Sequence, residues 1–400
     1  MNQEPYVRFI TGLQGTEIQK EEQKWLKKYR PLGAILFTRN CKSVSQVQNL
    51  VQDFRAQVGN PLAPVLIDQE GGLVTRLKPP TWPNLPSMGD FGAIYAQNPT
   101  LGEELLRLNI SGIAAQLREV GVNVVTSPCV DVLQPITHQV IGKRAFGGDP
   151  KVVAHLGQIV VDVFLNFGIL PVVKHFPGHG RARVDSHHSL PKVEIFESQL
   201  EKGVGSFFSS SHHLPKEQQV EMLKQTDWWP YLKIKNAPWL MLAHLKVDSL
   251  DANHVTSQSK KIFQTLKQEI GFQGVTISDC ISMQALQGNY PKRALEVCQA
   301  GFDLVLCGQG KIEDLAEIAQ HLKHEGCLCG EDFMEKVVRL KAKGKEWAEV
   351  VYAPVDLKGK KVDFHQIAKQ VHAEFQKWMQ PEKADGLGLA KKMDRTENFL

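Results

Sequence analysis

Short apolar runs recur along the chain, and longer segments with helical spacing of their apolar positions separate them. The runs do not alternate between apolar and polar residues, which is typical of strands that are buried on both faces. Such strands occur in sheets with helices on both sides, or in barrels that helices surround. Eight runs have this pattern: Tyr6–Ile10, Gly33–Phe37, Pro64–Ile67, Val122–Val125, Leu170–Val173, Trp239–Leu242, Gly274–Ile277 and Asp303–Leu306.

The segments between the runs predict helices, because their apolar residues return every three or four positions. The predicted helices cover Thr16–Tyr29, Ser43–Val58, Thr100–Val120, Pro150–Phe167, Ser259–Ile270, Met283–Ala300 and Ile312–His324. Eight strands that alternate with helices predict an α/β protein with a (β/α)8 TIM barrel. An open, doubly wound sheet is the alternative, but no strand–helix junction carries G-x-G-x-x-G and the chain has no P-loop.

Two regions depart from the repeat of strands and helices. Residues 206–229 form a long excursion between the fifth and sixth runs. After the last predicted helix the chain is amphipathic at first and then, from Gln380 on, polar and glycine-rich. We therefore expect one catalytic barrel domain over residues 1–350 and a C-terminal extension over residues 351–400 that is helical at first and then disordered.

The composition is that of a globular protein in water, with 42% hydrophobic and 22% charged residues. The net charge of +4 is small and Lys and Arg are scattered, so we expect no nucleic-acid partner. The N-terminus lacks a signal-peptide pattern and no apolar run approaches the ~18 residues that cross a bilayer, so we expect no membrane partner. Seven cysteines, an odd number spread along the chain, are typical of reduced thiols. We expect a cytoplasmic protein.

Charged and titratable residues follow most of the runs. If the runs are barrel strands, the residues directly after them share one rim, where barrel enzymes have their active sites. Simpler roles are open for each residue, since Asp68 could pair with Arg76 and Asp279 could cap the next helix. The candidates at this rim are Asp68, Glu70 and Arg76 after the third run, Asp131 after the fourth, Lys174 and His175 after the fifth, His244 after the sixth and Asp279 after the seventh.

The densest cluster follows the fifth run, where residues 174–188 hold four histidines, an acid, a lysine and two arginines. Asp185 and His187 can form a dyad in which the carboxylate fixes the imidazole tautomer and raises its basicity. Such a dyad can move a proton near neutral pH. The histidines could instead hold a metal ion, but the Pro-Gly between His175 and His179 keeps these two off one helix face. We expect no metal and no cofactor.

These motifs resemble those of family-3 glycoside hydrolases, and most closely those of the bacterial cytoplasmic β-N-acetylglucosaminidases of cell-wall recycling. Lys-His-Phe-Pro-Gly-His-Gly followed by Asp-Ser-His looks like the signature of that family. The resemblance covers the chain from about Tyr6 to about Leu340. Four further motifs fall in the family's order: Gly33–Asn40, Ile67–Gly72, Ile141–Gly147 and Ser278–Met283.

The resemblance implies an enzyme with a single TIM-barrel domain. It also implies that the enzyme retains the anomeric configuration of the sugar it releases and needs no metal. It identifies Asp279 as the catalytic nucleophile and Asp185 with His187 as the acid/base dyad. A carboxylate nucleophile on one face of the anomeric carbon and a proton donor on the other are what a retaining glycosidase needs. The residues that would hold the hydroxyls and the N-acetyl arm of N-acetylglucosamine are Asp68, Arg76, Arg144, Lys174, His175 and Met283. The chain departs from the family at Cys280, where another acid is frequent.

The implied substrate is a small molecule, a peptidoglycan fragment in which terminal N-acetylglucosamine precedes 1,6-anhydro-N-acetylmuramic acid, and a monomer is favoured. A phosphorylase is an alternative, because a histidine acid/base does not repel phosphate and Arg181 and Arg183 lie close to the dyad in sequence. Two other classes stay open. One is a metal-dependent hydrolase built on the histidine cluster, and the other is a barrel that binds sugars without catalysis.

Overall fold

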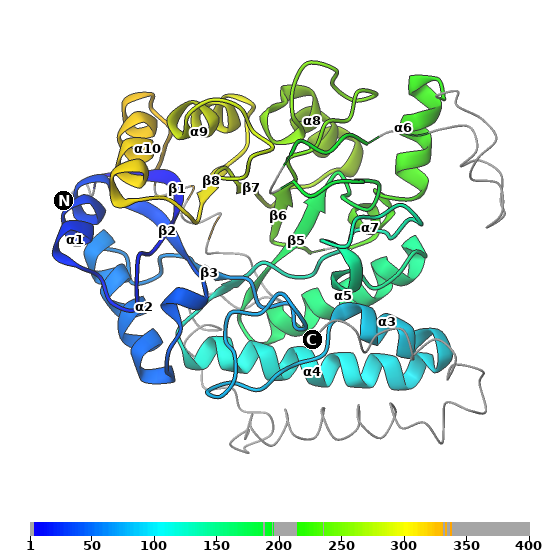
Figure 1. The fold of residues 1–400 in the computed structure, drawn as a ribbon, viewed down its shortest axis with the longest axis horizontal. Coiled ribbons are helices and arrows are strands. Elements are labelled where there is room, and N and C mark those ends of the chain that lie inside the picture. The colour runs from blue at the N-terminus through cyan, green and yellow to red at the C-terminus, as the bar shows by residue number, and fades with distance from the viewer. Residues whose placement is uncertain are drawn as a thin grey trace. The chain divides into compact units, whose positions relative to one another are not determined.

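The computed structural model describes residues 4–186, 189–193, 195, 214–234, 236–330, 333 and 337 of the 400-residue chain. Eight parallel strands in this part of the chain close into a barrel, because the first strand pairs with both the second and the eighth (Figure 1). The TIM barrel expected from the sequence is confirmed. The strands are β1 (Tyr6–Gly12), β2 (Pro31–Leu36), β3 (Val65–Ile67), β4 (Val124–Val125), β5 (Leu170–Phe176), β6 (Trp239–Leu242), β7 (Val275–Cys280) and β8 (Leu304–Cys307).

The helices lie outside the barrel and connect one strand to the next (Figure 1). A short strand after the last of them, β9 (Leu328–Cys329), pairs antiparallel with β1. The described helices are α1 (Lys20–Tyr29), α2 (Val44–Val58), α3 (Met88–Gln97), α4 (Pro99–Glu119), α5 (Pro150–Asn166), α6 (Lys216–Gln225), α7 (Trp229–Lys233), α8 (Lys260–Thr265), α9 (Tyr290–Gln299) and α10 (Ile312–His324).

Apolar and polar residues do not alternate along the strands, because both faces of each strand are covered. Every residue of β2, β5 and β6 is buried. Phe9 and Ile10, which are neighbours in β1 and point to opposite faces, are both fully buried. Removing such a side chain from water stabilises the fold by about 1.5–3 kcal/mol. The barrel interior and the surrounding helices therefore both demand apolar residues from the same strand.

Helix starts follow local side-chain chemistry. The Asp149 carboxylate accepts a hydrogen bond from the Lys151 backbone N–H (2.8 Å), and Pro150 occupies the first turn of α5. The sequence also predicts that α1 begins at Thr16, and this is wrong by four residues. The Glu22 carboxylate in the first turn accepts from the Gln14 backbone N–H (3.1 Å), which holds the preceding residues as a loop over the helix start.

The helix predicted over Met283–Ala300 is too long, because α9 begins only at Tyr290. Gly288 has a φ of +86°, and the Asn289 side chain accepts from the Lys292 backbone N–H (3.1 Å). The chain therefore turns at Gly288 and is capped at Asn289. The residues before this turn form a loop at the end of β7.

Some expectations fall outside the described residues. Of the excursion over residues 206–229, the described part contains α6 and the start of α7, and residues 206–213 lie outside it. The expected domain boundary at residue 350 and the extension over residues 351–400 also lie outside it. Among the described helices, none combines the length and the hydropathy that a transmembrane span requires.

Candidate active site

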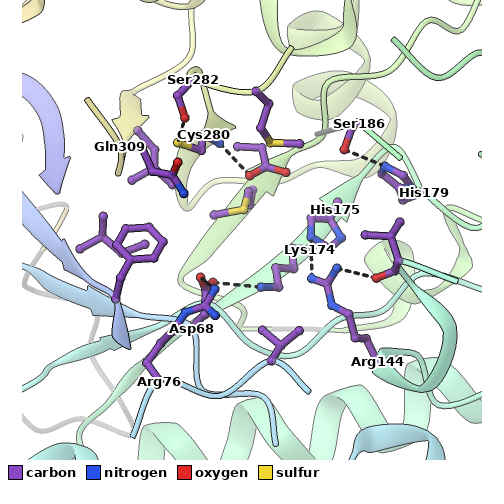
Figure 2. Close-up of a pocket in the computed structure, with 18 of the residues that line it drawn as sticks. Asp68, Arg76, Arg144, Lys174, His175, His179, Ser186, Cys280, Ser282 and Gln309 are labelled. Atoms are coloured by element: carbon purple, nitrogen blue, oxygen red, sulfur yellow. Dashed lines mark hydrogen bonds and ion pairs between the residues drawn. The ribbon is translucent and has the colours of Figure 1, made fainter. Parts of the chain in front are cut away.

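A cavity of about 670 Å³ opens at the C-terminal ends of the barrel strands (Figure 2). Its wall takes residues from the ends of β2, β5, β6, β7 and β8, so it occupies the rim where barrel enzymes bind their substrates. The volume is typical of small-molecule sites. Seven of the nine residues expected at the site line it: Asp68, Arg76, Arg144, Lys174, His175, Asp279 and Met283.

Glu70 stands behind the cavity wall and holds two residues that line it. Its carboxylate forms a bidentate pair with Arg144, at 3.0 Å for both the Nε–Oε2 and the Nη2–Oε1 distance. Lys174 Nζ lies 2.5 Å from Oε1, and the Lys174 and Glu70 side chains are only 3% and 1% exposed. Burial alone would raise the pKa of Glu70, but the charges of Arg144 and Lys174 hold it below its ordinary value. The two cations are therefore fixed in place.

Asp68, at the end of β3, is held by cations on both of its oxygens. Arg76 Nη2 donates to Oδ2 (2.7 Å), and Lys174 Nζ lies 3.4 Å from Oδ1, toward which it extends from β5 (Figure 2). Thr126 Oγ1 also donates to Oδ1. Burial opposes the ionisation of Asp68, but Lys174 and Arg76 outweigh it and lower the pKa of this carboxyl. An ionised acceptor beside two cationic donors suits the hydroxyl groups of a sugar.

His175 is oriented by one acid and one cation. Its Nδ1 lies 2.7 Å from Asp131 Oδ2, and because a carboxylate only accepts, Nδ1 carries the proton. Its Nε2 lies 3.2 Å from Arg144 Nη2 and accepts from it (Figure 2). Asp131 is fully buried, and although burial opposes its ionisation, His175 lowers the pKa of its carboxyl. The imidazole is thus fixed in one orientation and one tautomer.

Three side chains around Asp131 could in principle hold a metal ion. Ligand atoms of Cys129, Asp131 and His175 lie within 4.8 Å of one another. However, Asp131 Oδ2 already accepts from the Cys129 thiol (3.2 Å), and burial raises the pKa of that thiol well above its ordinary value. The Arg144 guanidinium at 3.2 Å from His175 would also repel a cation. The trio therefore fits a hydrogen-bonded cluster better than a metal site.

Asp279 differs from the other carboxylate of the cavity wall. It lies half-buried at the end of β7 and accepts a hydrogen bond from the Cys280 backbone N–H (2.7 Å). Whereas Asp68 is tied to two cations, Asp279 forms no ion pair with any described residue. Burial opposes its ionisation, but the His175 and His244 imidazoles lower the pKa of this carboxyl. Asp279 is therefore an ionised carboxylate whose oxygens can reach a ligand.

The loop after β5 is described in part. Asp185 is half-buried, and its backbone carbonyl accepts from the Ser189 N–H (3.1 Å). The next residue, Ser186, lines the cavity, and Asp185 does not. His187 lies outside the described residues, and so does His188 of the metal-binding alternative. The acid/base dyad stays a prediction.

His179, which the sequence offered only as part of the metal-binding alternative, also lines the cavity. Its Nε2 lies 3.4 Å from Ser186 Oγ (Figure 2), and among the described residues its buried Nδ1 has no hydrogen-bond partner. Burial lowers the pKa of His179 to about 4. The imidazole is therefore neutral near pH 7.

Cys280 lines the cavity beside Asp279. Its Sγ accepts from the Gly308 backbone N–H (3.2 Å) and lies 3.0 Å from Ser282 Oγ. A hydrogen bond from Cys307 is the largest cause that lowers the pKa of the Cys280 thiol to about 6. Sequence reasoning noted Cys280 as a departure from the family, named Glu70 as a candidate at the rim without identifying its partners, and gave no role to Cys307. Cys307 ends the strand next to β7, so the rim rule that found Asp279 could have placed the thiol pair as well.

Comparison with known proteins agrees with the sugar-binding character of this cavity. The model of the glycosyl hydrolase family 3 N-terminal domain matches residues 6–214 and 202–342. A β-hexosaminidase of Thioalkalivibrio sulfidiphilus is 33% identical over 299 residues, which make up 74% of this chain and 79% of that protein. Family and relatives therefore both describe an enzyme that cleaves glycosidic bonds.

Solved structures show the same fold. A family-3 β-N-acetylglucosaminidase from Paenibacillus sp. has a TM-score of 0.70 and 26% identity, covering 91% of this chain and 66% of that one. NagZ from Neisseria gonorrhoeae, solved with N-trifluoroacetyl-D-glucosamine, has a TM-score of 0.70 over 93% of this chain and 99% of that one; at 22% identity this likeness concerns the fold alone. The protein is a glycosidase of the β-hexosaminidase type, and the chain belongs to glycoside hydrolase family 3.

Proposed function

We propose that the protein releases terminal, non-reducing N-acetylglucosamine from peptidoglycan fragments, with retention of configuration and through a covalent glycosyl-enzyme on Asp279. The observation that carries this proposal is the contrast between the two carboxylates of the cavity wall. Asp68 is bound by Arg76 and Lys174, whereas Asp279 is ionised and forms no ion pair with any described residue. A nucleophile must be charged and must have an oxygen free to attack the anomeric carbon.

In the proposed reaction Asp279 attacks one face of the anomeric carbon while His187 protonates the departing glycosidic oxygen. Asp185 holds the His187 imidazole in the productive tautomer and stabilises its charged form. His187 then removes a proton from water, which attacks the glycosyl-enzyme and frees Asp279. Two inversions at one carbon give net retention.

The sugar would be held by the fixed charges around the cavity. Asp68 and Lys174 present an acceptor and a donor 3.4 Å apart, which suits adjacent hydroxyl groups of one pyranose ring. Arg144, Arg76 and His175 add donors and acceptors whose positions are already set by buried partners. Met283 lines the same cavity and offers an apolar contact. These side chains therefore do not have to become ordered when the sugar binds.

The aglycone we propose is 1,6-anhydro-N-acetylmuramic acid, with or without its peptide, and we place the reaction in the cytoplasm as part of cell-wall recycling. Two observations support this part of the proposal. The relatives are named β-hexosaminidases, and the Paenibacillus structure is a β-N-acetylglucosaminidase. All seven cysteines are free thiols, as is usual in a reducing compartment.

Sugar preference and stereochemistry test the proposal together. Turnover of an aryl β-N-acetylglucosaminide should exceed that of the glucoside, the galactoside and the N-acetylgalactosaminide, and early NMR spectra should show the β-anomer of the product. Asp279→Ala should lower kcat roughly 10³-fold or more, because the covalent route is lost. Formation of the α-anomer, or full activity of Asp279→Ala, would contradict the mechanism.

A phosphorylase remains the second candidate, and one observation weakens it. Arg181, which the sequence offered as a phosphate ligand, is buried and donates from Nε to Asp227 Oδ2 (2.7 Å). Arg181 is also absent from the residues that line the cavity. We therefore expect free N-acetylglucosamine even in phosphate buffer, and N-acetylglucosamine 1-phosphate as the main product would reverse this choice.

A further inference from the structure

A second cavity, of about 1100 Å³, is lined by residues of α8 and α9 and of the loops that follow β5, β6 and β7. We call it the basic groove, because five lysines line it against two carboxylates, Asp251 and Glu296. The volume is at the upper end of what small-molecule sites offer, so the groove can take several linked residues of a ligand. The five lysines are Lys192, Lys246, Lys260, Lys261 and Lys292.

The basic groove and the candidate active site share a wall. Gln284 lines the active-site cavity, and the next residue, Ala285, lines the groove. In the loop after β5, Ser186 lines the first cavity and Lys192, six residues later, lines the second. Ala285 is six residues from Asp279, which bounds their separation to roughly 20 Å. A ligand whose sugar occupies the active site can thus extend into the groove.

The carboxylates nearby neutralise only part of the positive charge of the groove, since Lys246 lies 3.9 Å from Asp248 Oδ1. Asp251 turns toward its own loop, where its Oδ2 accepts from Ser259 Oγ (2.6 Å) and lies 3.1 Å from His254 Nδ1. Glu296 reaches Lys292 at 3.9 Å. In the part of the chain that the structure describes, no carboxylate pairs with Lys192, Lys260 or Lys261. Three cations are left facing solvent.

The lysines also stand at positions where a positive charge destabilises the local structure. Lys260 and Lys261 begin α8, and Lys292 stands in the first turn of α9, where the helix dipole disfavours positive charge. Lys192 and Lys246 lie opposite each other in a parallel bridge, held by the Val193 N–H to Lys246 carbonyl bond (2.8 Å). Like charges at opposed positions destabilise a pair of strands. An anionic ligand would relieve both kinds of repulsion.

We infer that the basic groove binds the carboxylates of a peptide carried by the leaving-group sugar. The inference rests on the proposed function, because the substrate proposed there carries such a peptide on its muramyl residue. The groove would then act as a specificity site: it lowers KM for peptide-bearing fragments and leaves the chemistry at Asp279 unchanged. Because all of the groove lysines except Lys246 are exposed, the attraction should weaken as salt is added.

Three substrates test the inference: an aryl β-N-acetylglucosaminide, the peptide-free disaccharide, and the disaccharide with its peptide. The variant Lys260→Glu/Lys261→Glu/Lys292→Glu should lose about tenfold in kcat/KM on the peptide-bearing disaccharide, since each exposed charge contributes a small factor and reversal doubles its effect. Turnover of the other two substrates should stay as in the wild type. Amidation of the peptide carboxylates should likewise abolish the preference of the wild type for the peptide-bearing disaccharide over the peptide-free one.

The matched control is Lys20→Glu/Lys24→Glu/Lys27→Glu on α1, which makes the same change in net charge on exposed residues of another helix. This control should keep the wild-type preference. An unchanged ratio between the two disaccharides in the groove variant would overturn the inference and leave the proposed function intact. Failure of the wild type to cleave either disaccharide, with the aryl glycoside still turned over, would overturn the proposed substrate and the groove's role together.

Discussion

The two halves of the chain segment around β5 are built in different ways. In β5 itself every residue is buried, and Lys174 and His175 each contact a buried acid. The loop that follows stays buried as far as Ala182, but farther along Val184 is 41% exposed and Asp185 is half-buried. Lys174 and His175, which are expected to hold the sugar, are therefore part of the packed barrel, whereas Asp185, which is expected to act in proton transfer, is only half-buried. This comparison teaches that binding and proton transfer can be altered separately.

The largest expected effects test this separation directly. Asp185→Ala should lower kcat on an aryl β-N-acetylglucosaminide about 10²- to 10⁴-fold, because the acid/base dyad is lost. The same change should alter the free energy of unfolding by about 1 kcal/mol or less, since Asp185 is only half-buried. Initial rates and denaturant melts of the same preparation measure both quantities.

Glu70→Ala is the counterpart in the barrel wall. It leaves Lys174 and Arg144 buried without their shared carboxylate, and this should cost roughly 3–5 kcal/mol of the free energy of unfolding. Asp53→Ala on α2, an exposed acid, is the matched control and should be nearly neutral. If Asp185→Ala destabilises the protein as much as Glu70→Ala does, the loop belongs to the core and the comparison fails.

The pH dependence of stability gives the next largest effect. His179 has a pKa of about 4 in the folded protein because it is buried, against about 6.5 when unfolded. Between these values the unfolded chain binds the extra proton, so stability should decrease as the pH falls from 6.5 to 4, by up to about 3 kcal/mol. Burial lowers the pKa of His244 in the same direction.

His179→Gln should therefore reduce the slope of unfolding free energy against pH without abolishing it. Urea melts at several pH values measure the slope, which is independent of any constant cost of the substitution. An unchanged slope in His179→Gln would show that the pKa of His179 is not lowered in the folded protein.

The smallest expected effect concerns Cys280. Cys280→Ser should change kcat by less than about threefold, because the hydroxyl keeps the hydrogen bonds to Gly308 and Ser282. With a pKa of about 6 the wild-type thiol is a thiolate at pH 7.5, so iodoacetamide should inactivate the enzyme and N-acetylglucosamine should slow this. Cys280→Ser should resist, and Cys327→Ser should remain sensitive. Equal resistance of both variants to iodoacetamide would contradict the assignment of Cys280 as the reactive thiol.

The strands could be predicted because burial on two faces leaves an unbroken apolar run at each of them. Helix α3 could not, because Gly89 and Gly92 lower its helix propensity. The structure explains these glycines: a Cβ at Gly92 would collide with the Phe146 carbonyl oxygen, so the helix needs a bare backbone to pack on that loop. The position of α3 therefore depends on its contact with the loop that holds Phe146, and the local sequence pattern does not reveal that contact.

The members of the site could be predicted from the ends of the strands, but their partnerships could not. Glu70 and Arg144 are 74 residues apart and meet only because the barrel closes. The contrast between a bound Asp68 and an available Asp279 likewise depends on where Lys174 points. Sequence spacing reports which residues share a rim, and burial and distance decide which of them neutralise each other.

The closure of the barrel also sets an order of events during synthesis. β1 can pair with β2 as soon as Leu36 has left the ribosome, but its other edge must wait for β8, which ends at Cys307. Chains grow at roughly 5–20 residues per second, so this apolar edge stays open for tens of seconds. An open strand edge recruits other chains. Nascent chains that stall before Leu304 should therefore aggregate instead of accumulating as partial barrels.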